Sequence, residues 1–123
     1  MLIRLGLAVI WLLHFLPLAL LAPLGRGLGL LLFLLARERR KVALTNLKLC
    51  FPDQSDKRLR RLARLHFEAL GRSLVEHGLL WWSSAARLQR LIRVEGLENW
   101  QAVADRPVIW LAPHFIGLEP CPA

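Results

Sequence analysis

The strongest constraint on this chain is an uncharged apolar run near its N-terminus, from Leu5 to Gly25. A helix needs roughly 20 apolar residues to cross the hydrocarbon core of a bilayer, so this run is long enough to span it. Pro17 and Pro23 interrupt the run, which leaves open a bent span or a pair of helices. A second apolar run, Leu28 to Ala36, is too short to cross alone and would extend a tilted span or lie at the interface.

A cleaved secretory signal peptide is the main alternative to a retained membrane anchor. Arg4 followed by apolar residues fits the start of such a peptide, but no A-x-A-like cleavage site follows. The apolar character resumes after Pro23 and then meets a cluster of arginines, which is a stop-transfer pattern. Positive charge concentrated after the span predicts that the N-terminus lies outside and that Arg37 onward lies in the cytoplasm.

Apolar and basic residues are segregated along the chain. The net charge is +8 although 55% of the residues are hydrophobic. A basic balance suits nucleic acid, anionic lipid or an acidic protein as partner, and the apolar leader favours lipid. The chain has no zinc spacing or RNP-like motif, so nucleic acid is not an expected partner. Residues 37–64 hold ten basic residues against three acidic ones; the basic ones are Arg37, Arg39, Arg40, Lys41, Lys48, Lys57, Arg58, Arg60, Arg61 and Arg64.

Three smaller features of the apolar and basic segments have ordinary structural interpretations. His14, the ionisable group of the first apolar run, stands near Trp11, and a structural role is the more usual one there, although intramembrane ionisable groups can mark function. The G-x-G-x-G pattern of residues 25–29 follows no strand, so it indicates close helix packing and no phosphate loop. Cys50 and Cys121 form no C-x-x-C pair and indicate neither a disulfide framework nor a metal site.

Two helices are expected after the anchor. Residues 38–50 form a short one that ends at Phe51, because a proline disfavours helix in the residue before it. Ser55 or Asp56 then caps a longer helix that runs to about Leu80. This longer helix is basic and amphipathic, which suits a membrane surface, a partner, or ordinary packing with a charged face in water. Its apolar positions recur with the helical period at Leu59, Leu62, Ala63, Phe67, Leu70 and Leu74.

The pattern changes near residue 92. Arg93 to Gly96 is a candidate strand, Leu97 to Ala104 a candidate helix, and Pro107 to Ala112 a continuous apolar run typical of a buried strand. Strand, helix and strand begin an α/β unit. The expected fold class is therefore α/β with an incomplete sheet. Its parts are a membrane anchor with a transmembrane helix (1–36), a basic helical region (37–91) and the start of an α/β catalytic domain (92–123).

His114 and Glu119 are the candidate catalytic residues. In open α/β sheets the chemistry lies just beyond the carboxyl ends of strands, which is where His114 stands. A histidine can accept a proton from a hydroxyl at neutral pH, and a carboxylate can hold its tautomer. Five residues along a helix correspond to a rotation of about 140°, so the two side chains meet only if the chain turns between them. Gly117 permits such a turn.

Several motifs, in order, resemble the lipid A lauroyl/myristoyl acyltransferases, the late acyltransferases of Gram-negative bacteria. The resemblance implies transfer of a fatty acyl group from acyl carrier protein, or from acyl-CoA in relatives, to a hydroxyl of a lipid A precursor. His114 would be the general base and Glu119 its partner. Because the acyl donor is already a thioester, no cofactor, metal or covalent nucleophile is implied. The motifs are the apolar anchor, residues 40–47 (RKVALTNL), 49–52 (LCFP), Phe67, 70–71, 81–82, 94–98 (VEGLE) and the H-x4-D/E box from His114 to Glu119.

The same resemblance implies a location at the bacterial inner membrane, with membrane lipid, a glycolipid acceptor and an acidic carrier protein as partners. A basic cytoplasmic surface suits both a glycolipid phosphate and an acidic carrier protein. Family members are much longer, so the expectation is a truncated and inactive N-terminal fragment. Two alternatives stay open: an acyltransferase for another glycolipid, and a non-catalytic, membrane-anchored basic interaction protein in which His114 is incidental.

Overall fold

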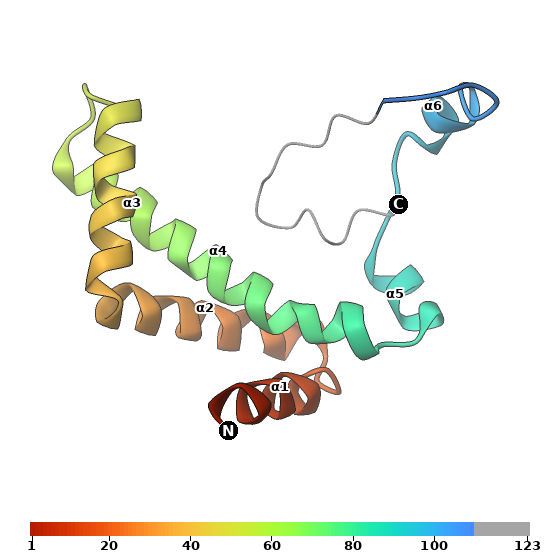
Figure 1. Ribbon diagram of the computed structural model, residues 1–123, viewed down its shortest axis with the longest axis horizontal. Coiled ribbons are helices and arrows are strands. Elements are labelled where there is room, and N and C mark those ends of the chain that lie inside the picture. The colour runs from red at the N-terminus through yellow and green to blue at the C-terminus, as the bar shows by residue number, and fades with distance from the viewer. Residues whose placement is uncertain (110–123) are drawn as a thin grey trace. The chain divides into compact units, whose positions relative to one another are not determined.

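A computed structural model of the protein describes residues 1–109 (Figure 1). The chain divides into two compact units, Met1–Trp82 and a second that begins at Ser83. The first unit holds α1 (Leu2–Leu13), α2 (Leu18–Leu35), α3 (Arg37–Cys50) and α4 (Asp56–Trp82). The described part of the second unit holds the short helices α5 (Ala85–Leu91) and α6 (Leu97–Gln101).

The expected α/β fold is wrong for the part of the chain that the structure describes, which contains helices and turns but no strand. Residues 93–96 are irregular and end at Gly96, whose φ of 77° leads into α6. Residues 107–109 are irregular too, while the rest of the second expected strand lies outside the described residues. A strand satisfies its backbone groups only by pairing with a neighbour, and residues 1–109 contain no partner strand.

The apolar run from Leu5 to Gly25 does not form one helix. α1 ends at Leu13, and Pro17, in an extended conformation with φ −64° and ψ 150°, precedes α2. Proline lacks an N–H and disfavours helix in the residue before it, so the helix breaks here; Pro23, by contrast, lies inside α2. The helix pair left open by the sequence is therefore the arrangement found. By length and composition, α2 is the one described helix that could cross a membrane, with a mean hydropathy of 2.1.

α2 and α4 are in backbone-to-backbone contact. A Cβ atom at Gly25 would lie 2.5 Å from the Cα atom of Arg72, and one at Gly29 would lie 2.6 Å from that of Glu68. A Cβ atom at Gly71 would overlap the carbonyl oxygen of Gly25. The pairing shows that the two helices are antiparallel. The glycine pattern seen in the sequence is thus confirmed as a packing surface at Gly25 and Gly29, whereas a Cβ atom at Gly27 would meet nothing within 4 Å.

The buried face of α4 repeats every four residues. Leu59, Ala63 and Phe67 are buried as the sequence predicts. Leu74 is 40% exposed instead, because the glycine contact turns the Gly71 face of α4, and with it Val75 and Leu79, toward α2. α4 starts at Asp56 and α3 ends at Cys50, which confirms both predicted helices around the turn at Pro52.

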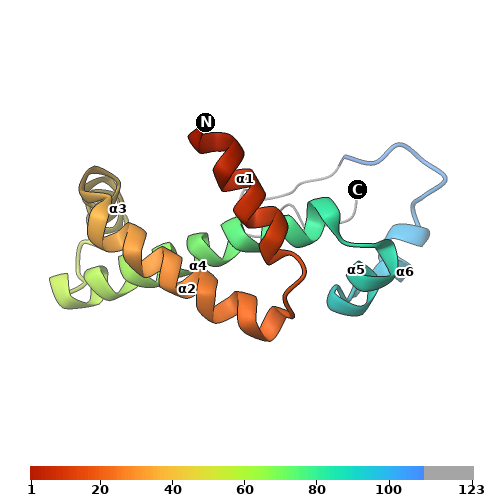
Figure 2. The ribbon, with the colours of Figure 1, turned by 90° about the horizontal axis from the view of Figure 1, so that it is seen from below.

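α1 packs on the C-terminal end of α4. A Cβ atom at Gly78 would lie 2.7 Å from the carbonyl oxygen of Ile10, so this crossing is also close. Figures 1 and 2 show α1 and α2 as a V-shaped pair on one side of α4, diverging from the turn that joins them, while α3 points away from that pair.

Adding a methyl group at Gly29 should destabilise the first unit. In Gly29→Ala the new Cβ would overlap the carbonyl oxygen of Phe67, which is backbone and cannot rotate away. Overpacking of this kind costs about 1–3 kcal/mol. Gly27→Ala is the matched control; it meets open space and should gain about 0.5–1 kcal/mol from the higher helix propensity of alanine. Thermal unfolding followed by circular dichroism in detergent measures both, and equal melting temperatures would contradict the glycine contact.

Candidate functional site

The predicted catalytic residues, His114 and Glu119, lie outside the described residues. Their proposed proximity therefore stays a prediction. Among residues 1–109 the structure shows no cluster of three or more His, Cys, Asp or Glu side chains that could hold a metal ion.

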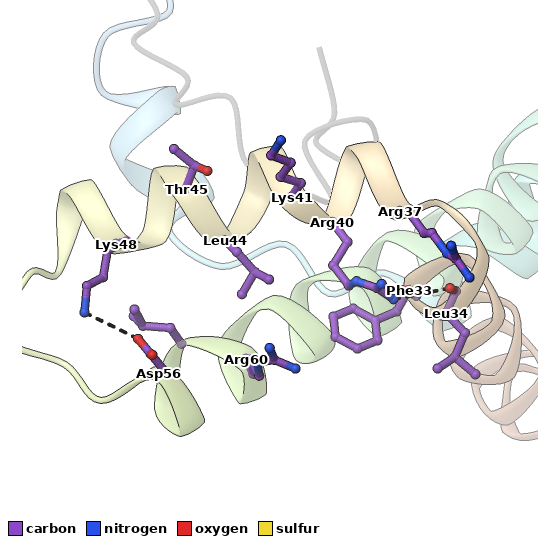
Figure 3. A pocket seen from close by; sticks show the side chains of 11 residues that line it. Phe33, Leu34, Arg37, Arg40, Lys41, Leu44, Thr45, Lys48, Asp56 and Arg60 are labelled. Atoms are coloured by element: carbon purple, nitrogen blue, oxygen red, sulfur yellow. Dashed lines mark hydrogen bonds and ion pairs between the residues drawn. The ribbon is translucent and has the colours of Figure 1, made fainter.

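A groove lies where the end of α2, α3 and the start of α4 meet (Figure 3). Its volume is about 710 Å³. We call it the basic groove, because five of its lining residues are cationic and one is acidic. The lining residues are Phe33, Leu34, Arg37, Arg40, Lys41, Leu44, Thr45, Lys48, Asp56, Leu59 and Arg60.

Arg40 fixes the corner between α2 and α3. Its Nη1 donates to the carbonyl oxygen of Phe33 at 2.5 Å and to that of Leu34 at 3.2 Å. These carbonyls belong to the last turn of α2, where helical partners are missing. The guanidinium also lies 5.3 Å from the centre of the Phe33 ring, a cation–π distance. One side chain thus caps α2, attracts the negative end of its dipole and holds α3 at its angle.

The other wall of the groove depends on the turn between α3 and α4. Lys48 Nζ and Asp56 Oδ1 lie 3.4 Å apart across this turn. Both side chains are exposed, so the pair contributes little to stability. Leu44 points from α3 toward α4 in Figure 3, and the buried Leu59 faces the same space. The floor of the groove is therefore apolar, and its edges are polar.

The electrostatics of the basic groove favour an anion. Arg37, Lys41 and Arg60 have no carboxylate partner among the described residues, and all three side chains are exposed. Several cations lining one groove at the end of an apolar helix suit a phosphate at a lipid–water boundary. The sequence revealed the basic cluster, but the reversal of the chain at Pro52 is what brings cations of α3 and Arg60 of α4 to the lining of one groove.

His14 forms a second cluster, at the junction of α1 and α4. It is 7% exposed, and its Nδ1 is within hydrogen-bonding reach of the carbonyl oxygen of Trp11. Its ring lies 3.9 Å from that of Phe15 and 6.2 Å from that of Trp82, centre to centre. These contacts use the imidazole for packing and support the structural interpretation.

Comparison with known proteins defines the class of this helical chain. The family model for the bacterial lipid A biosynthesis acyltransferases matches residues 1–121. The chain belongs to this family, which confirms the resemblance read from its motifs.

The similar proteins of known name are also enzymes of lipid A biosynthesis. The lipid A biosynthesis lauroyltransferase of Escherichia coli K12 is 35% identical over 117 residues, covering 94% of this chain and 38% of the relative. The palmitoleoyltransferase of the same strain is 34% identical over 116 residues, covering 93% and 38%. A lipid A biosynthesis acyltransferase of Haemophilus influenzae is 29% identical over 106 residues, covering 85% and 34%. The chain thus spans little more than a third of the length of these relatives, and no solved structure matches it significantly.

Replacing Arg40 should loosen the corner that forms the basic groove. Arg40→Ala removes two hydrogen bonds to helix-terminal carbonyls and the contact with Phe33, which together are worth about 1–2 kcal/mol at a part-buried site. Arg39→Ala removes the same charge from an exposed neighbouring position and serves as control. We expect a lower melting temperature for Arg40→Ala alone. Identical unfolding curves for the two variants would contradict a capping role.

Proposed function

We propose that this chain forms the membrane-facing part of an acyltransferase that moves a fatty acyl group onto a hydroxyl of a lipid A precursor. Family membership over residues 1–121 supports the reaction class. Relatives named lauroyltransferase and palmitoleoyltransferase support a fatty acyl group as the transferred unit. The acyl donor in this proposal is acyl carrier protein, an acidic partner suited to a chain of net charge +8.

The basic groove is the observation that supports the acceptor part of the proposal. Five cations line it at the end of apolar α2, together with the apolar side chains of Leu44 and Leu59. A phosphorylated glycolipid presents its charge at the same depth at which its acyl chains enter the membrane. We assign the groove to a phosphate of the acceptor, held by cations that line it from α3 and α4, among them Lys41 and Arg60.

The proposed chemistry assigns His114 as general base and Glu119 as the carboxylate that orients it. His114 would take the proton of the acceptor hydroxyl while the hydroxyl oxygen attacks the thioester carbonyl carbon. The carbon–sulfur bond of the donor then breaks, and the imidazolium returns the proton to the departing thiolate. Glu119 would stabilise the imidazolium without itself being protonated. The motif order leading to residues 114–119 supports this assignment.

The proposed location is the inner membrane, attached through residues 1–36, with residues from Arg37 onward in the cytoplasm. The family and the apolar helix support attachment to the membrane. The cytoplasmic side is supported by the charge bias after Arg37, and it is the side that a carrier-protein donor requires.

The catalytic assignment is tested in a full-length family member at the positions aligned with His114 and Glu119. Positioned proton transfer typically contributes about 10²–10⁴-fold to rate, so histidine-to-alanine should lower kcat by at least that range. Glutamate-to-glutamine should lower kcat too, because the imidazole loses its orienting charge. Radiolabelled acyl transfer to a lipid A precursor measures both, with membrane association unchanged as control. Near-normal turnover of the histidine variant would end the general-base assignment.

The acceptor assignment is tested by binding to the chain itself. A Lys41→Gln/Arg60→Gln variant should raise the Kd for a phosphorylated lipid A precursor by about tenfold or more, at about 1 kcal/mol for each charge near the surface. Arg39→Gln/Arg61→Gln removes the same net charge outside the groove and should change Kd little. Native mass spectrometry from detergent gives both constants, and the dephosphorylated precursor should bind both variants alike. Equal loss of affinity in the two variants would rule out the groove as the site.

A further inference from the structure

If α2 crossed the membrane, its register against α4 would decide which residues of α4 enter the bilayer with it. The midpoint of α2, Leu18–Leu35, falls between residues 26 and 27. Gly25 and Gly29, on either side of this midpoint, lie against Arg72 and Glu68 of α4. At a rise of 1.5 Å per residue, the backbone of both charged residues would lie within about 4 Å of the bilayer centre.

Those charges are expensive at that depth. Arg64 is ion-paired with Glu68 at 2.7 Å, and Arg72 with Glu76 at 2.9 Å, along the part of α4 that faces α2. A single charged residue at the centre of a spanning helix costs about 2.5–3.5 kcal/mol, and pairing recovers only part of the cost of desolvation. Arg26, beside the midpoint of α2, is itself exposed. α2 is therefore less suited to crossing the membrane than its own apolar sequence indicates, because the charges of α4 would enter the bilayer with it.

Around its axis, α2 has three distinct sides. At 100° per residue its exposed leucines fall within an arc of about 100°. The face buried against α4, Leu21 with Gly25 and Gly29, is centred about 130° from that arc. Arg26 lies about 130° from the arc in the other direction. This is the pattern of a helix lying along an interface, with one side toward lipid. The exposed leucines are Leu20, Leu24, Leu31, Leu34 and Leu35.

α1 also exposes apolar side chains, and these are spread around its axis. It is 12 residues long, about 18 Å, which is too short to cross the hydrocarbon core. Its apolar side chains are nonetheless exposed, and Figures 1 and 2 place it beside α2 on one side of α4. The charged α3 points away from the pair. The large exposed side chains of α1 and the turn after it are Ile3, Leu5, Leu7, Val9, Trp11, Leu12 and Phe15.

We propose that α1 and α2 lie in the plane of the membrane, embedded in the cytoplasmic leaflet, and that α2 does not cross it. α4 then lies above them at the level of headgroups and water, where its ion pairs stay hydrated. Arg26 reaches the headgroups, and the cations at the α2 end of the basic groove lie near anionic lipid, which attracts each such cation by about 1 kcal/mol. The N-terminus stays on the cytoplasmic side, in place of the outside location expected from the charge asymmetry.

Depth measurements along α2 test the proposal. Spin labels are attached to single-cysteine variants at Leu20, Leu24, Leu31 and Leu35 in a Cys50→Ser/Cys121→Ser background. The full chain is reconstituted into vesicles of phosphatidylethanolamine and phosphatidylglycerol, and oxygen and nickel-complex accessibilities give each depth. We expect four similar depths. A crossing helix would instead place Leu24 deepest and Leu35 about 9 Å shallower, and that profile would overturn the proposal.

A label at Arg72 gives the decisive comparison, because its backbone lies against the middle of α2. In-plane helices leave this label as accessible to the nickel complex as a label on Cys50 in the Cys121→Ser chain. A crossing α2 would place it among the acyl chains, where the nickel complex does not reach.

Sidedness provides an independent readout. A short hydrophilic tag with one cysteine is added before Met1 in the Cys50→Ser/Cys121→Ser background. A membrane-impermeant maleimide should label it in inverted inner-membrane vesicles but not in spheroplasts. Cys50 in the Cys121→Ser chain marks the cytoplasmic side as control. Labelling of the N-terminal tag in spheroplasts would show that the chain crosses the membrane and would refute the in-plane arrangement.

Discussion

The contact between the glycines of α2 and α4 is the constraint on which the rest of the first unit depends. With no side chain at Gly25, Gly29 or Gly71, the two backbones approach closely enough that a single Cβ atom would overlap the opposite chain. This distance sets which face of α4 is buried and fixes the antiparallel register of the two helices. It also brings the C-terminal end of α4 against α1, where Gly78 allows the same close approach to Ile10.

Close packing of an apolar helix against a charged one has a consequence for the membrane. α2 has the length and composition of a membrane-spanning helix, whereas α4 carries two ion pairs opposite the centre of α2. Two helices in backbone contact cannot occupy different media along their whole length unless both lie parallel to the boundary between those media. Packing, hydrophobicity and charge are reconciled when the boundary runs along the helix pair.

The basic groove follows from the same arrangement of helices. α2 ends where Arg40 caps its last carbonyls, and α3 leaves at the angle that this side chain holds. α4 then returns beneath α3, so that cations from two helices face one space. In a family named for lipid A biosynthesis, a cationic groove at the end of an apolar helix suits the proposed acceptor, which is both phosphorylated and embedded in lipid.

The sequence alone determined the local elements and the family. Pro52 predicted the break between two helices, and the helices end and begin at the residues expected. The ordered motifs identified the acyltransferase family. Helical period found Leu59, Ala63 and Phe67 in the core but missed Val75 and Leu79, because the buried face follows the glycine contact and not hydrophobicity alone. The strand expected at residues 93–96 failed because local propensity supplies no pairing partner. Only the tertiary structure decided that α2 packs against a charged helix and that cations of α3 and α4 line one groove, since both depend on contacts between residues far apart in the chain.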